Sequence, residues 1–406
     1  MKRNLLFMCI LILTLNLAGC KWPMDEVNSD HIVHEDNSIA EDSKPTEVEV
    51  PVNYKPMEVE NYEPSEGLES ISMTILEGQG IPSIILKDPS EYKKKNPWFN
   101  YKDIEVLPVF INKNYNLLYH EGPVEYLTEE EAVEVSLLVA ERLGIDTGKY
   151  ECEDLGASYI IYFPNKQKAS FEICPSVDEV RIFFNPLNGN MDLSLPAIDE
   201  EDEDLLHEKY LVYYYQLFEN ILRMKQPVFE ASFERNIHGE KMYKYMIFNQ
   251  EDMVEDTIVN YSTNFARIYI DTNGLSGIDI SYKQLMDAAA PNGYENTIIE
   301  RLAKGNELEL LGYYPLINQE EAIEKILNKE YLSTIEYDRD IDLGDIMAIE
   351  LIYYWVPVNK TIQPVYRVYL DLKETMHDYG QYEEEGLNTY GIFYVPAIEA
   401  KYLNVG

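Results

Sequence analysis

The spacing of apolar residues changes along the chain and separates predicted strands from predicted helices. Residues 70–76, 83–86 and 104–112 alternate or run apolar between Gly and Pro residues, which predicts short strands. This strand pattern begins at about residue 68. The pattern therefore predicts a folded body that follows an N-terminal segment of a different kind.

A repeated start signal predicts two helices within that body. The segment 127–134, with the letters LTEEEAVE, recurs at 317–324 as INQEEAIE. Thr128 and Asn318 are natural N-caps, and a glutamate three residues further on completes a capping box in each copy. These acids could also form a ligand-binding pair, but we expect them to cap amphipathic helices.

A third helix is predicted over residues 205–224. An acidic run from Asp199 to Asp204 comes directly before it. Acidic side chains favour the positive end of a helix dipole, and a solvated run is the usual case. We therefore expect the run to lead into the helix and not to form a site.

A short string that begins with arginine occurs three times, as RIFFN at 181–185, RIYID at 267–271 and RVYLD at 367–371. Asn-Gly follows the first two copies, and Asn-Gly after alternating apolar residues is a strong hairpin signal. We expect each of these arginines to stand on the solvent face of its strand. The alternative is a shared anion site.

Together the repeats predict three units, each with one helix packed on an antiparallel sheet. Their approximate spans are 67–200, which includes the leading strands, then 201–311, and finally 312–406. A helix laid across one face of an antiparallel meander is an α+β design. The sequence thus predicts an α+β fold made of repeated units.

Residues 20–66 have the composition of a disordered acidic tether. Residues 21–66 hold 13 acidic residues and three lysines, with prolines spread through them and no sustained apolar period. Such a segment cannot offset its own ordering entropy. As a charged coil it would span about 40 Å on average, and on the order of 150 Å if extended.

The first 19 residues have the three parts of a bacterial signal peptide. Two basic residues precede an almost wholly apolar stretch at 5–15, which is too short to cross a bilayer comfortably. The letters LAGC at 17–20 then resemble the lipobox of bacterial lipoproteins at all four positions. That resemblance implies cleavage before Cys20 and lipidation of its sulfur, with palmitate-type chains that anchor the protein at the extracytoplasmic face of the cell membrane. A plain secreted protein and an uncleaved anchor are the alternatives.

The charge of the chain limits its partners. It contains 33 basic and 73 acidic residues, for a formal net charge of −40 at pH 7. Such a charge repels nucleic acid phosphates and anionic lipid headgroups. We therefore expect no nucleic acid partner, and acyl chains instead of a basic patch must hold the protein at the membrane.

Two ordinary cysteines, Cys152 and Cys174, remain after the predicted cleavage. Export permits a disulfide, which would be worth about 3 kcal/mol in the chain-entropy model. If the strands around Asn165 form a hairpin, Cys174 faces Ala157, and Cys152 lies on the order of 15 Å away along the strand. A disulfide would then need a chain reversal near Gly156, so the pattern favours two free thiols.

The sequence holds no catalytic motif. It lacks G-x-S-x-G, a Walker A loop, G-x-G-x-x-G and H-E-x-x-H. We therefore predict no enzymatic activity and no cofactor. His31 and His34 beside Asp30 could bind a transition metal, but only weakly, because the predicted tether would have to become ordered around it.

One acidic motif has the spacing of calcium ligands. Asp338, Asp340 and Asp342 alternate ahead of Gly344. An EF-hand needs glycine at loop position six and a bidentate glutamate at position twelve, where this chain has leucine and isoleucine. We therefore expect a polar connecting loop, with calcium binding as the alternative.

Tyrosine is abundant, with 33 residues that include runs at 213–215, 313–314 and 353–354. Tyrosine fills half-buried sheet faces well, with the ring inside and the hydroxyl outside. We therefore expect these residues to pack the sheets. Aromatic platforms such as Trp98 or Trp355 could also stack on glycans.

Four short stretches near the C-terminus, YPLI at 314–317, EEAI at 320–323, IELIYY at 349–354 and QPVYRV at 363–368, resemble PepSY-like domains. The strongest resemblance is to the YycH/YycI-type accessory proteins of Gram-positive two-component systems. It implies protein binding by an extracytoplasmic domain that restrains a sensor kinase or a peptidase. YycI-type proteins use an uncleaved membrane helix, where this chain would have a lipid anchor. The rest of the chain resembles uncharacterised Gram-positive lipoproteins.

These observations predict a surface-anchored, non-enzymatic, extracytoplasmic protein-binding or regulatory module. Its predicted partners are the membrane, through the lipid on Cys20, and a protein of the cell envelope. The alternative is a glycan- or solute-binding lipoprotein that uses aromatic platforms.

Overall fold

The protein combines helices with antiparallel strands, and strands predominate. The computed structural model describes residues 46–49, 62–73, 83–90, 104–111, 128–155, 158–163, 169–174, 179–184, 193–222, 224, 227–235, 241–249, 253–254, 257–258, 265–271, 273–281, 285, 298–299, 308–333, 335, 337, 339–354, 359–372 and 386–404. Within these residues the fold class is α+β, as the sequence predicts.

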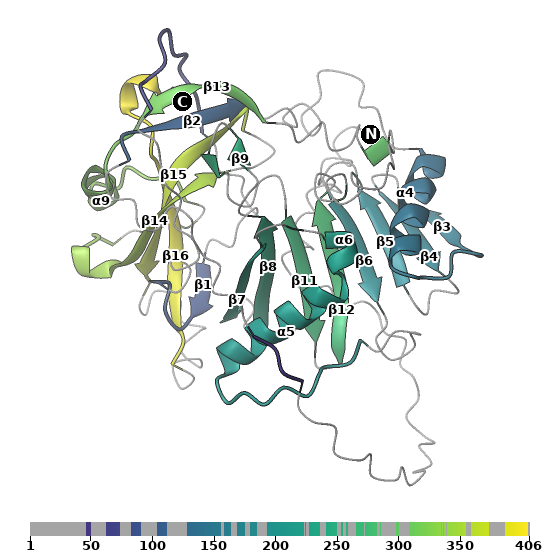
Figure 1. Ribbon diagram of the computed structural model, residues 1–406. Coiled ribbons are helices and arrows are strands. Elements are labelled where there is room, and N and C mark those ends of the chain that lie inside the picture. The colour runs from purple at the N-terminus through teal and green to yellow at the C-terminus, as the bar shows by residue number, and fades with distance from the viewer. Residues whose placement is uncertain are drawn as a thin grey trace.

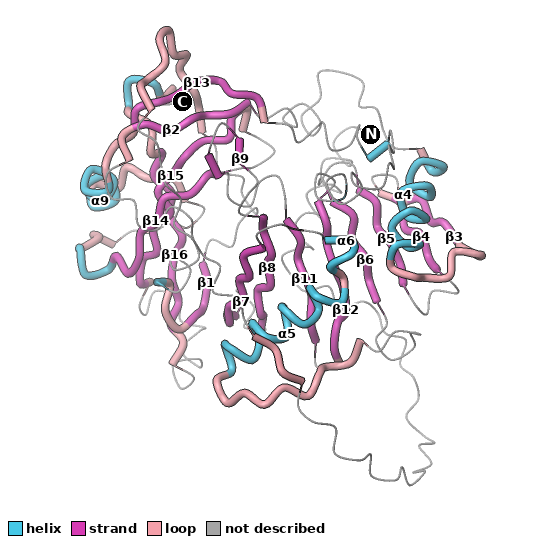
Figure 2. Tube along the Cα trace, in the orientation of Figure 1, coloured by secondary structure: helices cyan, strands magenta, loops and turns pink. Residues whose placement is uncertain are grey.

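One antiparallel sheet runs through the whole molecule (Figures 1 and 2). In spatial order its strands are β13 (Glu309–Pro315), β2 (Val106–Ile111), β15 (Thr361–Asp371), β16 (Asn388–Pro396), β1 (Ser83–Leu86), β7 (Pro227–Arg235), β8 (Lys241–Asn249), β11 (Phe265–Asp271), β12 (Gly274–Ser281), β6 (Glu179–Phe184), β5 (Ala169–Cys174), β4 (Tyr159–Phe163) and β3 (Glu151–Asp154). Strand β14 (Ile346–Tyr354) also pairs with β15, and β9 (Met253–Val254) pairs with β10 (Thr257–Ile258) separately.

The helices begin where the capping residues predict. In α4 (Glu129–Arg142) the Thr128 hydroxyl accepts the Glu131 amide at 3.2 Å, and the Glu131 carboxylate accepts the Thr128 amide at 3.0 Å. In α9 (Gln319–Leu327) the Asn318 side chain accepts an amide in the same way. In the first copy the repeated acid therefore caps its helix, as expected, and in the second copy the Asn318 side chain supplies the cap.

The predicted third helix is present but divided. It comprises α5 (Glu203–Leu217) and α6 (Glu219–Leu222), separated at Phe218. The Asp202 side chain caps α5 by accepting the Leu205 amide at 3.0 Å. The acidic run thus supplies the helix start, as expected. Two short 3-10 turns, η2 (Leu343–Asp345) and η5 (Ala400–Tyr402), complete the described helices.

Two large hydrophobic cores lie along the sheet. The first core joins α4, α5 and α6 to strands β4, β5, β6, β11 and β12, and in Figure 1 these helices lie on one face of the sheet. The second core joins α9 to β2, β14, β15 and β16. The predicted units 67–200 and 201–311 therefore contribute to one shared core.

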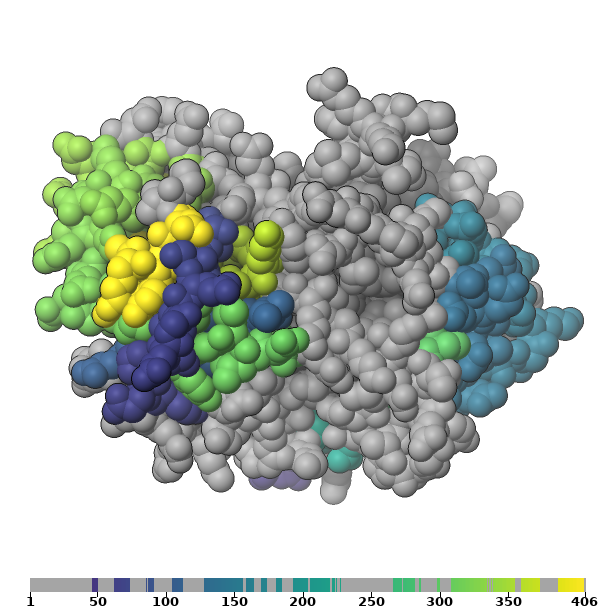
Figure 3. Space-filling model, turned by 90° about the horizontal axis from the view of Figure 1, so that it is seen from above, coloured from purple at the N-terminus to yellow at the C-terminus, as the bar shows by residue number. Residues whose placement is uncertain are grey.

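The leading strands belong with the C-terminal strands. Strand β1 pairs with β16 over its whole length, and β2 pairs with β13 and with β15. Ile71, within the expected strand 70–76, forms a parallel bridge with Leu403, and residues 74–76 lie outside the described residues. In Figure 3 the purple segment that contains Ile71 lies against the yellow C-terminal residues. Sequence proximity groups these strands with the N-terminal unit, whereas long-range pairing places them beside the C-terminal strands.

Parts of the predicted disordered tether are folded onto the body, which corrects that expectation for them. Val48 is buried in the first core, and the Thr46 amide donates to the Ala197 carbonyl at 2.7 Å. The Tyr62 ring stacks on Tyr313 with centroids 4.6 Å apart. One apolar side chain within an acidic stretch was too weak a sequence signal to show this docking.

Buried tyrosines use their hydroxyl groups inside the protein. The Tyr353 hydroxyl donates to the Pro108 carbonyl at 2.8 Å, and the Tyr366 hydroxyl donates to the Ile317 carbonyl at 3.1 Å. Tyr214 bonds backbone carbonyls in the same way. The expectation of packing is confirmed for these residues. The expectation of an outward hydroxyl is wrong, because each phenol satisfies a carbonyl within the core.

The register around the cysteines differs from the expected one. Phe163 pairs with Ala169, so the β4–β5 hairpin is centred on Lys166 and its register differs from the expected one by one residue. The chain does reverse before β4, because β3 pairs antiparallel with it and Cys152 faces Ile161. Cys174 lies two strands away from Cys152, at a distance of about 14 Å by strand geometry. Cys152 is accordingly a free thiol.

The β11–β12 hairpin provides a test of the packing around Gly274. This residue has φ of +131°, and a Cβ there would collide with the Leu193 carbonyl. We expect Gly274→Ala to reduce the free energy of unfolding by about 2 kcal/mol or more, measured by urea denaturation. Gly344→Ala is the matched control, because nothing lies within 4 Å of its Cβ position. Equal effects of the two substitutions would contradict the packing at Gly274.

The stability of the protein at alkaline pH tests the burial of Tyr366. Burial raises the pKa of Tyr366 to about 12 from an ordinary value of about 10. Because the folded state raises this pKa, the stabilising contribution is complete below about pH 10 and is lost as the pH rises through 12.

We therefore expect Tyr366→Phe to cost about 1 kcal/mol at pH 8, through the lost hydrogen bond. Above about pH 11 the order of stability should reverse, because only the wild-type phenol ionises on unfolding. Urea denaturation of both proteins from pH 8 to pH 12 measures this. A constant difference across that range would show that Tyr366 ionises equally in both states.

Candidate functional site

The three repeated arginines pair with carboxylates on neighbouring strands. Arg181 lies in β6, Arg267 in β11 and Arg367 in β15, and each faces an acid in the directly opposite register position. Arg181 is buried and Arg367 is largely buried, so the expectation of a solvent face is wrong for these two. The reason is that each charge has a partner available across the strand pair.

The first pair joins β5 to β6. Arg181 donates to the Glu172 carboxylate at 3.3 Å, and the exposed fractions of the two side chains are 11% and 14%. The Ser158 hydroxyl donates to the other oxygen of Glu172 at 3.1 Å. The carboxylate therefore has a charged and a neutral donor.

The second pair joins β11 to β12. Arg267 donates to Asp279 at 3.4 Å, and the Tyr269 hydroxyl donates to the same carboxylate oxygen at 2.6 Å. Asp279 is buried, whereas the Arg267 side chain remains 36% exposed. The shorter bond, and therefore the stronger constraint on the carboxylate, comes from the phenol.

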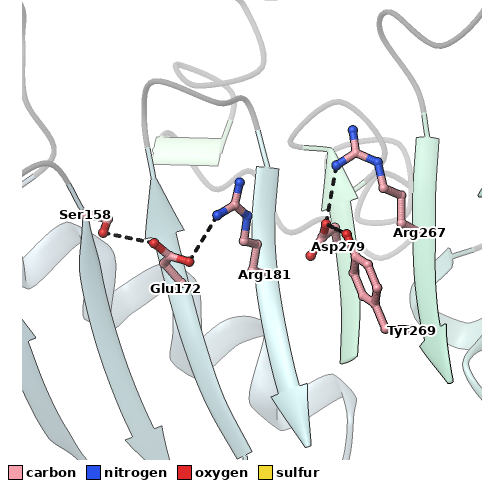
Figure 4. A network of polar contacts seen from close by, with 6 residues as sticks. All are labelled: Ser158, Glu172, Arg181, Arg267, Tyr269 and Asp279. Atoms are coloured by element: carbon pink, nitrogen blue, oxygen red, sulfur yellow. Dashed lines mark hydrogen bonds and ion pairs between the residues drawn. The ribbon is translucent and has the colours of Figure 1, made fainter. Parts of the chain in front are cut away.

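These two pairs form one row of alternating charge. Glu172 faces Arg181, Arg181 faces Asp279 across β6 and β12, and Asp279 faces Arg267. Figure 4 shows the row crossing adjacent strands on the face away from the helices. A one-residue shift of any strand would turn its charge towards the hydrophobic core, so the row favours the observed register.

The third pair is the most enclosed. Arg367 in β15 donates through Nε at 2.7 Å and through Nη2 at 2.6 Å to one oxygen of Glu350 in β14. The Glu350 side chain is only 2% exposed, and the Tyr369 hydroxyl donates to the same oxygen at 3.0 Å. The Arg367 guanidinium also lies 5.6 Å from the Tyr369 ring centroid, within cation–π range.

Burial raises the pKa of the two tyrosine phenols beside this pair. Burial raises the pKa of Tyr369 well above its ordinary value, while Arg367 opposes that shift. Tyr394, which faces Arg367 from β16, also has its pKa raised by burial. Both phenols therefore stay protonated at physiological pH, and Tyr369 can act as a hydrogen-bond donor to Glu350.

The chemistry of this arrangement is structural. One Glu350 oxygen already accepts from the Arg367 guanidinium and the Tyr369 phenol. An oxygen held by these donors is not placed to accept a proton from a substrate. The same internal pairing occupies Glu172 and Asp279. These groups are suited to fixing strand register.

The possible calcium motif is only partly within the described residues, because Asp338 lies outside them. The Asp340 side chain is fully exposed and pairs with Lys329 at 3.5 Å. Near Asp342, the Asp345 carboxylate accepts the Asp342 amide at 2.9 Å, which closes the η2 turn. Across the ranges that the structure describes, no group of three or more acids, histidines or cysteines could hold a metal ion.

Other predicted site residues lie outside the described residues. These are Cys20 with the signal segment, His31 and His34, and the aromatic candidates Trp98 and Trp355. Among the helices that the structure does describe, none is long and apolar enough to cross a membrane.

Sequence reasoning missed the acidic partners of the repeated arginines. Each of Glu172, Asp279 and Glu350 is the single interior acid of an otherwise apolar strand centre. Such an acid needs a partner when its strand is buried. That signal could have suggested buried pairs, but matching each acid to its arginine required the strand register.

Comparisons of this chain with protein-family models, with curated proteins and with solved structures found no match.

The enclosed pair can be tested by removing one charge. Glu350→Ala leaves Arg367 buried without this partner, so we expect a loss of about 3–5 kcal/mol in the free energy of unfolding. The control is Glu399→Ala, because the Lys401–Glu399 pair is 61% and 37% exposed and should contribute less than about 1 kcal/mol. The double substitution Glu350→Leu with Arg367→Met should recover much of the loss. Similar losses for the two alanine variants, measured in urea, would refute the buried-pair account.

Proposed function

We propose that this protein is a lipid-anchored, extracytoplasmic, non-enzymatic module that binds or regulates another protein of the cell envelope. The proposed location at the membrane rests on the LAGC lipobox at 17–20, which follows a signal-like segment. The mode of action rests mainly on the paired carboxylates Glu172, Asp279 and Glu350, which serve strand pairing instead of chemistry. Because these three carboxylates are paired within the sheet, they leave the rest of the surface to carry the proposed binding role.

We further propose that the body is made of repeated PepSY-like units. The support is a shared local geometry in which an arginine, a cross-strand carboxylate and a hydroxyl donor come together. Arg267 and Arg367 each have the donor tyrosine two residues further on in the same strand. The first copy has Phe183 at that position, and Ser158 supplies the hydroxyl instead. The copies differ in strand order, because the acid follows the arginine only in the middle unit.

The proposed anchor would be joined to the folded body by a linker shorter than the predicted tether. Since residues 46–49 already contact the first core, the linker from Cys20 to that contact comprises residues 20–45. Such a linker would span about 28 Å on average and about 90 Å when extended. The body would therefore meet partners in the space directly beside the membrane.

One experiment tests both the proposed membrane location and the proposed binding of an envelope protein. We expect the wild-type chain to remain in the membrane fraction of its native host, and Cys20→Ala to leave it, because two acyl chains anchor stably. Crosslinking in intact cells, followed by denaturing purification, should recover a defined envelope protein with the wild type and much less of it with Cys20→Ala.

Two outcomes would count against the proposal. Retention of Cys20→Ala in the membrane fraction would refute the lipid anchor. Recovery of no protein above that from cells without the chain would refute the binding role. A thermal shift of the purified chain with cell-wall sugars would instead favour the glycan-binding alternative.

A further inference from the structure

The two ends of the long sheet differ in what lies beside them. At one end Ser65 bonds both backbone groups of Tyr313 in β13: its amide donates to the Tyr313 carbonyl at 3.0 Å, and its hydroxyl accepts the Tyr313 amide at 2.9 Å. At the other end β3 is the last strand, and its only neighbour among the described strands is β4 (Figure 1). The N-terminal segment therefore covers part of the first end, whereas β3 forms the outer edge of the second.

The pairing of β3 with β4 determines which backbone groups of β3 face outward. The Leu155 amide donates to the Ser158 carbonyl at 2.9 Å, so these two residues form a hydrogen-bonded pair. Such pairs alternate with non-hydrogen-bonded pairs along an antiparallel ladder. Glu153 therefore bonds β4, whereas the amide and carbonyl groups of Cys152 and Asp154 face away from it. Outward backbone groups of this kind can pair with a further strand.

The edge formed by β3 is accessible to solvent. Three of its four residues are exposed, and the fourth, Cys152, is half-buried. Tyr150 and Leu155, which flank the strand, are 49% and 39% exposed. A segment bound along this edge could therefore reach both the backbone of β3 and an apolar side chain at each end of it.

Acidic side chains lie on both faces of β3. Because side chains alternate along a strand, Glu151 and Glu153 project to one face, and Cys152 and Asp154 project to the other. Burial raises the pKa of the Cys152 thiol, and the nearby carboxylates of Glu129 and Asp154 raise it further. The first turn of α4 thus adds negative charge on the Cys152 side. A strand placed beside β3 would meet acids on both of its faces.

This charge selects the kind of segment that can bind. Residues 149–155 contain one lysine and three acids, a formal charge of −2, in a chain whose net charge is −40. Pairing of β3 with the same strand of a second copy would bring acids close to acids, which is destabilising. A positively charged segment would instead be attracted to this edge.

We propose that the outer edge of β3 binds an extended cationic segment of a partner protein, which adds to the sheet as a further strand. The outward backbone groups of Cys152 and Asp154 bond the segment, and its lysine or arginine side chains pair with the acids on either face. This assignment rests on the binding role proposed above, and it gives that role a surface and a partner chemistry.

Peptide binding to the purified full-length chain in detergent tests the edge. The probe is a fluorescent ten-residue peptide of alternating lysine and threonine, and its affinity is measured by fluorescence anisotropy at low ionic strength. We expect this peptide to bind the wild-type chain. The same peptide with its four central amides N-methylated keeps its charge but loses those donors, so its affinity should be at least about tenfold lower.

A paired substitution tests the acids. Glu151→Gln with Glu153→Gln should weaken binding of the unmethylated peptide about tenfold, within the range that two cross-strand charge pairs supply. Glutamine can still accept the Tyr162 hydroxyl, which Glu153 accepts at 3.1 Å. The matched control is Glu320→Gln with Glu324→Gln, which removes two exposed charges from α9 and should leave the affinity unchanged. In Figure 1, α9 and β3 lie at opposite sides of the molecule.

Three results would overturn the site at β3. The first is no binding of the peptide, or equal binding of its methylated form, which would leave charge attraction alone. The second is an equal effect of the two paired substitutions. The third is equal recovery of the same envelope protein by crosslinking with the wild type and with Glu151→Gln, Glu153→Gln.

The third result would leave the proposed binding role in place and exclude only this surface. The peptide assay needs neither the lipid nor the native host. A failure of that assay is therefore distinct from a failure of the wild type to recover any envelope protein, which would refute the binding role itself.

Discussion

Glu350 is almost completely removed from water, so its charge depends on the Arg367 guanidinium directly across the strand pair. A buried carboxylate without such a partner would be strongly destabilising. That dependence makes the β14–β15 register a requirement, because a shift of one residue would separate the two charges. The second core follows from this register, because the neighbours of Glu350 and Arg367 in their strands then lie in it: Ile349, Leu351, Tyr353, Tyr366, Val368 and Leu370.

The same constraint operates in the first core over a wider area. The row from Glu172 through Arg181 and Asp279 to Arg267 crosses four strands that belong to two of the predicted units. Its charges alternate, so the two inner strands, β6 and β12, each face an opposite charge on both neighbours. The β6–β12 contact within this row is where the two predicted units become one sheet with a shared core. Polar pairing on one face and apolar packing on the other thus specify the same arrangement.

Connections between the two cores are of a different kind. The N-terminal segment contributes Val48 to the first core and Ile71 to the second, and β1 pairs with both β16 and β7. These contacts are local and small compared with the cores that they connect. Along the sheet, β1 joins the strands of the two cores, and it pairs with β7 at Ile85 and Leu86.

The amino-acid sequence by itself determined the helix starts at Thr128 and Asn318, the strands that contain the repeated arginines, and the α+β class. These features could be predicted because capping residues and apolar periodicity act over a few neighbouring residues. The resemblance of residues 17–20 to a lipobox, with lipidation of Cys20, remains a prediction. Only the tertiary structure decided the partners of those arginines and the placement of β1 and β2 beside the C-terminal strands. It also decided the docking of Val48. These features depend on strand register and on contacts between residues far apart in the chain, and no local pattern of residue types specifies either of them.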